Sequence, residues 1–444
     1  MIEGRLGHAK MLAEARGETY LYVDIRSELD KLEQIGKFRT GLEPLNLAIV
    51  IDHSGSMKGQ RQRNALDAAA GMIRRLRDGD TVSVVAYSDE ARIVVPVTRV
   101  ATATRERIVS DMRDSIGRKP SGNTCISCGL DLGMQTLARR RGGIKRMLLL
   151  SDGEANRGIK DEAGIRVLAR QARNRGATIS SIGVDVDYNQ RLMSAIAREA
   201  NGRHYFSETG ENLEQIFDQE LESLITAIAK HGQLVVALAP GVRVGEVFDR
   251  SYQQVDRRVI VPMGTFAAGE SKTLLLRLEL PASPVGERPI AAVSLTYDDL
   301  TGGGQGDCFG ELAVQMIKTP SEVSPLDAIV LGRLTRSETA RTLEQANSLF
   351  AKGRSSEAQA IVDSHLGRIR KRRARAGALS KAEDFFDPFG RDLDESFNEQ
   401  TSVLDSANAG FQAAEAAGPQ PAAATHSGKA QVRRNAEQAD ALSL

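Results

Sequence analysis

The chain has 444 residues, a formal net charge of +1, 41% hydrophobic residues and 4% aromatic residues. Its length predicts two or three structural units. Because the charges nearly cancel, no global field would recruit nucleic acid or an anionic membrane, and we expect no nucleic-acid partner. No apolar run reaches the roughly 20 residues that cross a bilayer. The amino terminus also lacks the apolar centre of a secretory signal. We therefore expect no membrane span and a cytoplasmic location.

Residues 1–44 are predicted to form an amino-terminal segment that contains one strand. The strand covers 19–25, where polar and apolar side chains alternate and strand-favouring residues are frequent. It precedes any regular alternation of strands and helices, so its partner must lie farther along the chain. We expect it to join the β-sandwich domain predicted below, whose edges need partners.

Residues 45–228 are predicted to form an α/β domain. Buried or half-buried strands are expected at 45–51, 81–87, 91–97, 146–150, 178–184 and 204–206. Helices are expected between them, at 61–76, 105–116, 126–139, 161–175, 189–199 and 212–228. This alternation predicts a doubly wound, mostly parallel sheet that helices cover on both faces.

The remainder of the chain divides into three predicted parts. Short β runs separated by Gly and Pro predict a flanking β-sandwich domain at 232–318. Apolar residues at helical spacing predict a helical hairpin at 325–376, with Gly353 at the end of its first helix. From 377 to 444 Ala, Gln, Ser and Gly become frequent, and we expect a mostly disordered tail.

Oxygen-bearing side chains follow two of the predicted parallel strands. Asp52, Ser54 and Ser56 come directly after the buried run 45–51, and Asp152 follows the strand 146–150. Parallel strands end at one edge of the sheet, so these side chains should share that edge. Thr124 begins a predicted helix and should lie there too. Hard oxygen ligands of this kind suit Mg²⁺, whereas the alternative for Asp52 and the serines is an ordinary helix N-cap.

These residues resemble the von Willebrand factor A domain and its metal-ion-dependent adhesion site. The pattern Asp-x-Ser-x-Ser, then a Thr in a Gly-containing loop, then an Asp after a later strand, is matched by Asp52, Ser54, Ser56, Thr124 and Asp152. The resemblance implies Mg²⁺, with Mn²⁺ or Ca²⁺ as alternatives, contacted by the hydroxyls and approached by the carboxylates through waters. Asn123 departs from the pattern, since many relatives have Gly there. His53 is expected near the site without being a ligand, because Mg²⁺ favours oxygen.

The resemblance also implies a function. Such a site binds an Asp or Glu of a partner protein, and the domain order resembles bacterial and inter-α-trypsin-inhibitor-like A-domain proteins. We therefore expect a scaffold or adaptor in a bacterial multiprotein complex, with a MoxR-like AAA+ ATPase or a kinase/phosphatase system as partner, and no enzyme activity. The alternative is a metal-dependent hydrolase or phosphatase using Asp52 and Asp152. Aspartyl-phosphate enzymes, however, resemble Asp-x-Asp with a downstream Lys, and position 54 is Ser.

Two other motifs allow more than one interpretation. Cys125 and Cys128 form a Cys-x-x-Cys, which we interpret as small buried side chains rather than a disulfide, redox or zinc motif. Their place at a helix start could nevertheless lower the pKa of Cys125. The basic run 368–375 is expected to be a solvated helix end, with nucleic acid or an acidic partner as the alternative. Arg61, at the start of the helix predicted at 61–76, suggests no functional role.

Overall fold

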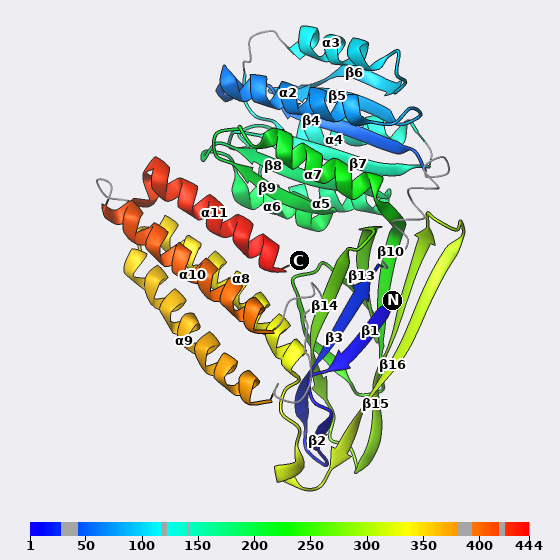
Figure 1. Cartoon of the computed structure of the whole chain (residues 1–444), viewed down its shortest axis with the longest axis vertical. Helices are drawn as coiled ribbons and strands as arrows, with labels where there is room; N and C mark the ends of the chain where they lie inside the picture. The colour runs from blue at the N-terminus through cyan, green and yellow to red at the C-terminus, as the bar shows by residue number, and fades with distance from the viewer. Residues whose placement is uncertain (28–42, 117–121, 141, 380–392, 417–421, 444) are drawn as a thin grey trace. The chain divides into compact units, whose positions relative to one another are not determined.

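The fold is described from a computed structural model (Figure 1). The described residues are 1–27, 43–116, 122–140, 142–379, 393–416 and 422–443, so 380–392 and 417–421 of the predicted tail lie outside them. The chain forms two compact units. We call Leu32–Lys230 with Leu300–Gly302 the α/β unit, and Met1–Lys31 with His231–Asp299 and Gly303–Leu444 the β-helical unit. Among the described residues, no helix is long and apolar enough to cross a membrane.

The α/β unit is built on a six-stranded sheet with the order β6-β5-β4-β7-β8-β9. Its strands are β4 (Leu45–Asp52), β5 (Thr81–Tyr87), β6 (Ala91–Arg99), β7 (Ile144–Ser151), β8 (Ala177–Val184) and β9 (Asn201–Ser207). Only the pair β5–β6 is antiparallel; the other neighbours run parallel. The predicted doubly wound, mostly parallel sheet is confirmed.

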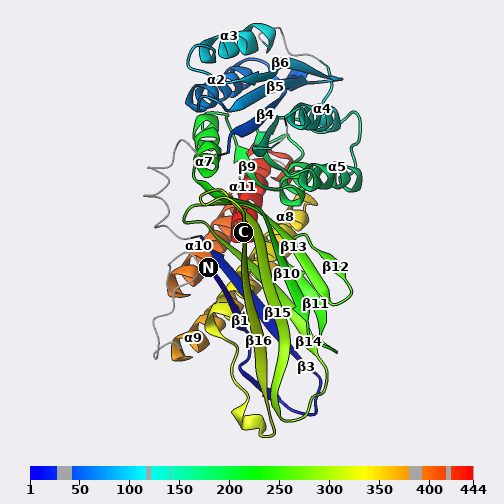
Figure 2. The ribbon, with the colours of Figure 1, turned by 90° about the vertical axis from the view of Figure 1, so that its right-hand side faces the viewer.

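Helices cover both faces of this sheet, as Figure 2 shows. One face carries α2 (Gln60–Arg75), α3 (Arg105–Ile116) and α7 (Leu213–Ile225); the other carries α4 (Ile126–Ala138), α5 (Glu162–Asn174) and α6 (Gln190–Glu199). Central strand β4 is buried along its whole length because alternate side chains serve the two faces. Leu47, Ile49 and Ile51 belong to the core that includes residues of α2, α3 and α7.

The β-helical unit contains two sheets. The four-stranded sheet has the order β1-β3-β14-β11, and the six-stranded sheet has the order β12-β13-β10-β15-β16-β2. The strands are β1 (Ile2–Leu6), β2 (Lys10–Leu12), β3 (Gly17–Arg26), β10 (Ala227–Leu238), β11 (Arg243–Phe248), β12 (Gln253–Val255), β13 (Arg258–Ala267), β14 (Ser271–Leu280), β15 (Gly286–Asp299) and β16 (Gln305–Ile317). Strand β3, predicted at 19–25, pairs with β14 and therefore lies in the four-stranded sheet. Strands β1 and β2 were not predicted.

Helices α8 (Ala328–Ala351), α9 (Ser355–Leu379), α10 (Leu393–Ala416) and α11 (His426–Ser443) pack together in the same unit. The first two form the predicted hairpin. The prediction of a mostly disordered tail is wrong for the part that α10 and α11 occupy. Phe397, Leu404 and Phe411 recur every seventh residue and are buried against α8 and α9. Good helix formers such as Ala let a weakly apolar segment fold when such a stripe has a partner.

The basic run 368–375 lies on α9. Arg372 pairs with Glu338 of α8, and Arg373 pairs with Asp394 of α10. These two cations therefore serve contacts between helices, whereas a solvated helix end was expected.

Candidate functional site

The predicted site lies where β4 and β7 end. These strands pair in parallel, with Ile51 opposite Leu150, so that Asp52 ends β4 beside the last residues of β7. The hydroxyl of Ser151 donates to Asp52 Oδ2 at 2.8 Å, and Asp152 is the next residue. The two carboxylates therefore share one edge of the sheet, as the parallel topology predicted.

Asp52 also shapes the loop that follows it. Its Oδ1 accepts a hydrogen bond from the backbone N–H of Ser54 at 2.8 Å. The hydroxyl oxygen of Ser54 lies 3.0 Å from that of Ser56, and Ser56 Oγ donates to Asp152 Oδ1 at 2.7 Å. A continuous chain of hydrogen bonds thus links the first three predicted ligands to the last one.

Thr124 reaches the same place from the start of α4. Its backbone N–H donates to the side-chain oxygen of Asn156 at 2.8 Å. A Cβ added at Gly153 would lie 3.2 Å from Thr124 Oγ1 and 3.6 Å from Ser56 Oγ. The Thr124 hydroxyl is therefore a close neighbour of the loop that carries Asp152, and all five predicted residues come together. That they bind a metal stays a prediction.

The charges of this edge are poorly compensated. Asp52, Ser54, Thr124 and Asp152 are buried, whereas Ser56 is exposed. Burial, and then the charge of Asp152, raises the pKa of Asp52 to about 7, although hydrogen bonds from Ser54 and Ser151 oppose the shift. Burial also raises the pKa of Asp152. Two crowded carboxylates with raised pKa values are the electrostatic environment that a bound cation would relieve.

The donor set also fits a hard cation. Within the described part of the chain, no group of three or more His, Cys, Asp or Glu side chains is placed to hold a metal. A metal at this edge would thus depend on hydroxyl oxygens in addition to Asp52 and Asp152. Hydroxyl and carboxylate oxygens suit Mg²⁺, Mn²⁺ or Ca²⁺ better than softer metals.

His53 directly follows Asp52, but its ring contacts a residue outside the candidate site. Its Nε2 is 3.0 Å from the backbone oxygen of Ile116, the last residue of α3. The ring is buried. This contact agrees with the expectation that His53 is not a ligand.

Arg61 contacts the candidate site, which the sequence analysis did not predict. Its Nη1 donates to Asp152 Oδ2 at 3.3 Å and to the backbone oxygen of Ser56 at 3.1 Å. Its other terminal nitrogen pairs with Asp185, which directly follows β8. The parallel-strand rule places Asp185 at the same edge. That rule could have found the acid, but the rotation of α2 that brings Arg61 to it has no local sequence signal.

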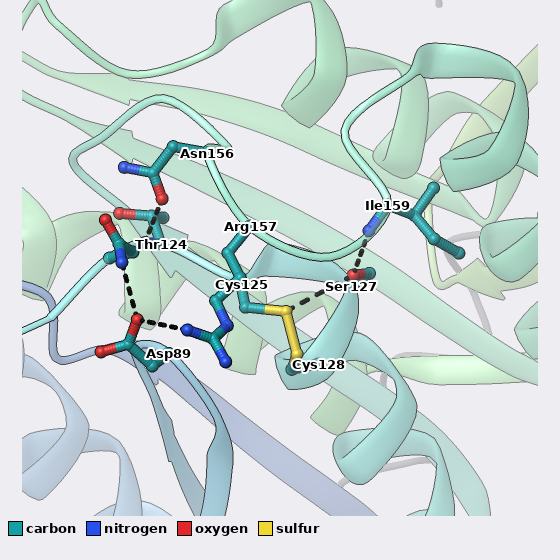
Figure 3. The surroundings of a disulfide bond; sticks show 9 residues. Asp89, Thr124, Cys125, Ser127, Cys128, Asn156, Arg157 and Ile159 are labelled. Carbon is teal, nitrogen blue, oxygen red and sulfur yellow. Dashed lines mark hydrogen bonds and ion pairs between the residues drawn. A yellow bond between two sulfur atoms is a disulfide. The ribbon is translucent and has the colours of Figure 1, made fainter.

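Polar contacts and a disulfide hold the segment around Thr124 in place (Figure 3). Asn123, the residue that departs from the family pattern, donates from Nδ2 to Asp89 Oδ1 at 2.7 Å, and Arg157 pairs with the same Asp89 oxygen at 3.0 Å.

Cys125 and Cys128 form a disulfide. The interpretation of these cysteines as small buried side chains without a disulfide is therefore wrong. The first turn of α4 brings their Cα atoms to 5.3 Å, within the range that a disulfide spans.

A doubly wound, mostly parallel sheet with hydroxyls and carboxylates at the carboxyl ends of its strands is typical of one class of α/β domain. Residues 46–219 match the von Willebrand factor type A domain family. The chain therefore contains a von Willebrand factor type A domain over residues 46–219, as the sequence pattern indicated.

Bacterial and animal proteins are similar to this chain. An uncharacterized protein of Synechocystis, sll0103, is 30% identical over 272 residues, which are 59% of this chain and 63% of that protein. The uncharacterized protein YfbK of Escherichia coli is 28% identical over 59% of this chain and 45% of its own length. The chain thus spans less than two thirds of either relative. Bovine inter-alpha-trypsin inhibitor heavy chain H4 is 25% identical over 42% of this chain and 21% of its own length.

Solved structures share the fold over most of the chain. A von Willebrand factor type A protein from Catenulispora acidiphila has a TM-score of 0.71 at 18% identity, covering 91% of this chain and 89% of that one. The ArnB paralog VWA2 from Sulfolobus acidocaldarius has a TM-score of 0.55 at 15% identity, covering 91% and 97%. At such identities the likeness concerns the fold alone.

Proposed function

We propose that the α/β unit is a metal-dependent protein-interaction module that binds an acidic side chain of a partner protein. The observation that carries the proposal is the convergence of Ser54, Ser56 and Thr124 with the carboxylates of Asp52 and Asp152 at one edge of the sheet. The von Willebrand factor type A domain, commonly a protein-interaction module, agrees with it.

The roles within the site follow from charge. The hydroxyls of Ser54, Ser56 and Thr124 would hold Mg²⁺ through neutral oxygens, while Asp52 and Asp152 would supply the negative charge. Bound Mg²⁺ would offer a coordination position that a carboxylate can fill. The three hydroxyls add no negative charge, and Arg61 offsets part of the charge of Asp152, so the bound cation would keep an attraction for a partner's Asp or Glu.

An enzyme is not part of this proposal. Both carboxylates are engaged by hydroxyls: Asp52 by Ser151 and Asp152 by Ser56. Asp152 is further engaged by Arg61. These contacts give no specific support to the hydrolase alternative.

Within the same proposal, the protein is a cytoplasmic scaffold or adaptor in a bacterial multiprotein complex. A MoxR-like AAA+ ATPase and a kinase or phosphatase system are the partner classes that the resemblance to bacterial A-domain proteins suggests. The similarity to the Synechocystis and Escherichia coli proteins supports the resemblance to bacterial A-domain proteins alone.

Affinity capture from lysate tests the proposal. Wild-type protein would be compared with the Asp52→Ala/Ser54→Ala variant, each in Mg²⁺, in EDTA, and in EDTA followed by excess Mg²⁺. We expect a set of proteins that is lost in EDTA, regained with Mg²⁺ and absent from the variant. Ser110→Ala, an exposed serine on α3 that contacts Asp114, is the matched control and should behave as wild type. An identical set of captured proteins in every arm would refute a metal-dependent role.

A further inference from the structure

We propose that Cys125 and Cys128 form a reversible thiol–disulfide site whose redox state sets the metal affinity of the neighbouring edge. The first half concerns the cysteines alone. The second half rests on the proposed function, because it requires that Asp52, Ser54, Ser56, Thr124 and Asp152 bind a metal.

The two sulfurs differ in access. Cys125 directly follows Thr124, is the N-cap residue of α4 and is fully buried. Cys128 lies in the first turn of the same helix and is partly exposed. An incoming thiol therefore reaches Cys128 Sγ first, and Cys125 is the group that leaves.

The exchange is balanced when a dithiol reductant supplies the electrons. A reductant thiolate attacks Cys128 Sγ, a new S–S bond forms there, and the Cys125–Cys128 bond breaks to release Cys125 as a thiolate. The second thiolate of the reductant then attacks the reductant's other sulfur, which is bonded to Cys128 in the mixed disulfide, and Cys128 leaves as a thiolate. Two protons from the reductant end on the two protein thiols, and the reductant becomes a disulfide. The N-terminus of α4 favours the departing Cys125 thiolate.

The disulfide is packed against the loop that carries Asp152. The backbone N–H groups of Asn156 and Arg157 donate to the carbonyl oxygen of Thr124 at 3.2 and 3.4 Å. Farther along this loop, the N–H of Ile159 donates to Ser127 Oγ at 2.9 Å (Figure 3). Residues 156–159 thus rest on the segment that holds both Thr124 and the disulfide.

Gly158 leaves little room for the sulfurs to separate. A Cβ added there would lie 2.6 Å from Cys125 Sγ and 2.3 Å from Ser127 Oγ. Two free thiols do not remain at the bonding distance of about 2.05 Å. We infer that reduction moves Cys125 Sγ, which cannot shift toward Gly158 unless that segment is displaced. Since Thr124 precedes Cys125 and Asp152 begins the Gly158 loop, either movement disturbs the candidate metal site.

The chain provides an internal control. Cys308 is a free, partly exposed cysteine on β16, in the β-helical unit. It should be labelled by an alkylating reagent whether or not Cys125 and Cys128 are joined.

Alkylation tests the first half. Folded wild-type protein would be equilibrated in dithiothreitol buffers of graded redox poise, quenched in acid, denatured, alkylated and weighed as an intact chain. We expect one label in oxidising buffers, on Cys308, and three in reducing buffers. One label throughout, or three throughout, would overturn the claim of a reversible site.

Isothermal titration with Mg²⁺ tests the second half. We expect the reduced form to bind about ten-fold more weakly than the oxidised form, which is the lower end of what loss of a supporting contact costs a metal site. The Cys308→Ser variant should keep this difference, and Cys125→Ser/Cys128→Ser should lose it. Equal affinities of the two wild-type forms would refute the coupling alone, whereas absence of binding in both forms would refute the proposed function.

Discussion

Arg61 Nη1 lies 3.3 Å from Asp152 Oδ2, which places a cation of the chain itself against a carboxylate of the candidate metal site. The guanidinium is also paired with Asp185, and its side chain is 36% exposed. Arg61 thus compensates part of the charge that a bound metal would otherwise neutralise.

Replacement of Arg61 should therefore strengthen metal binding. We expect Arg61→Gln to bind Mg²⁺ about five-fold more tightly than wild type, since one partly solvated like charge near the site costs about 1 kcal/mol. Isothermal titration at low ionic strength measures the change. Arg63→Gln removes the same charge from an exposed position of α2, where Arg63 contacts Gln60, and should leave the affinity near that of wild type. Weaker binding by Arg61→Gln would mean that Arg61 orients Asp152 instead of competing with the metal.

A buried arginine of the β-helical unit should matter for stability. Arg333 of α8 pairs with Asp249 at 3.0 Å, is only 6% exposed, and also donates to Thr273 and Ser337. We expect Arg333→Ala to lower the free energy of unfolding by about 3–5 kcal/mol, because the Asp249 carboxylate, 7% exposed, loses its ion-pair partner and keeps a hydrogen bond from Ser337. Urea denaturation measures this loss.

The control for this substitution lies on the same helix. Arg341 pairs with Glu246 at 2.6 Å and is 40% exposed. Arg341→Ala should cost about 1 kcal/mol or less, as exposed pairs do. Equal losses for the two variants would contradict the expectation that the buried Arg333–Asp249 pair contributes more to stability than the exposed pair.

His365 predicts a dependence of stability on pH. The ring is buried on α9, where Nε2 lies 2.8 Å from Thr339 Oγ1 and Nδ1 faces Arg368 at 2.9 Å. Burial, and then the charge of Arg368, lowers the pKa of His365 to about 4, although Glu338 opposes the shift. The unfolded chain, with a pKa near 6.5, binds the proton more readily, so stability is complete above about pH 6.5 and falls as the pH drops toward 4.

The loss should approach about 3 kcal/mol at the acid end, given about 1.4 kcal/mol per unit of pKa difference. Denaturation curves of wild type and His365→Gln between pH 6.5 and 5 measure its onset as a difference between the two proteins, because Asp52, with a pKa of about 7, titrates in the same range in both. Wild type should lose stability relative to His365→Gln as the pH falls through this range. A slope equal to that of wild type would show that His365 does not carry the dependence.

The parts of the fold and site that could be predicted were those that follow from strand direction. Asp52 and Asp152 stand after parallel strands, and this alone places them at one edge. Arg61 was missed because its contact depends on how α2 is rotated over the sheet, which no local pattern encodes. The disulfide was missed because a Cys-x-x-Cys at a helix start is compatible with both free and joined sulfurs.

The sequence of the carboxyl-terminal helices α10 and α11 contains an apolar spacing that the overall composition did not reveal. Mean polarity suggested disorder, yet Phe397, Leu404 and Phe411 are spaced by seven residues and form a buried stripe. Their burial needs the partners α8 and α9, whose position comes from the tertiary fold. Strands β1 and β2 likewise gain their order from pairing with β3 and β16, which lie elsewhere in the sequence.

The measurement that tests the central claim most directly is a Mg²⁺ titration of the purified, EDTA-stripped chain. Isothermal titration of wild type should show one binding event per chain. Ser54→Ala and Thr124→Ala should each weaken it by about ten-fold or more, since each removes one hydroxyl ligand. Ser110→Ala should bind as wild type does. Absence of saturable binding to wild type, or unchanged affinity in both ligand variants, would contradict the account.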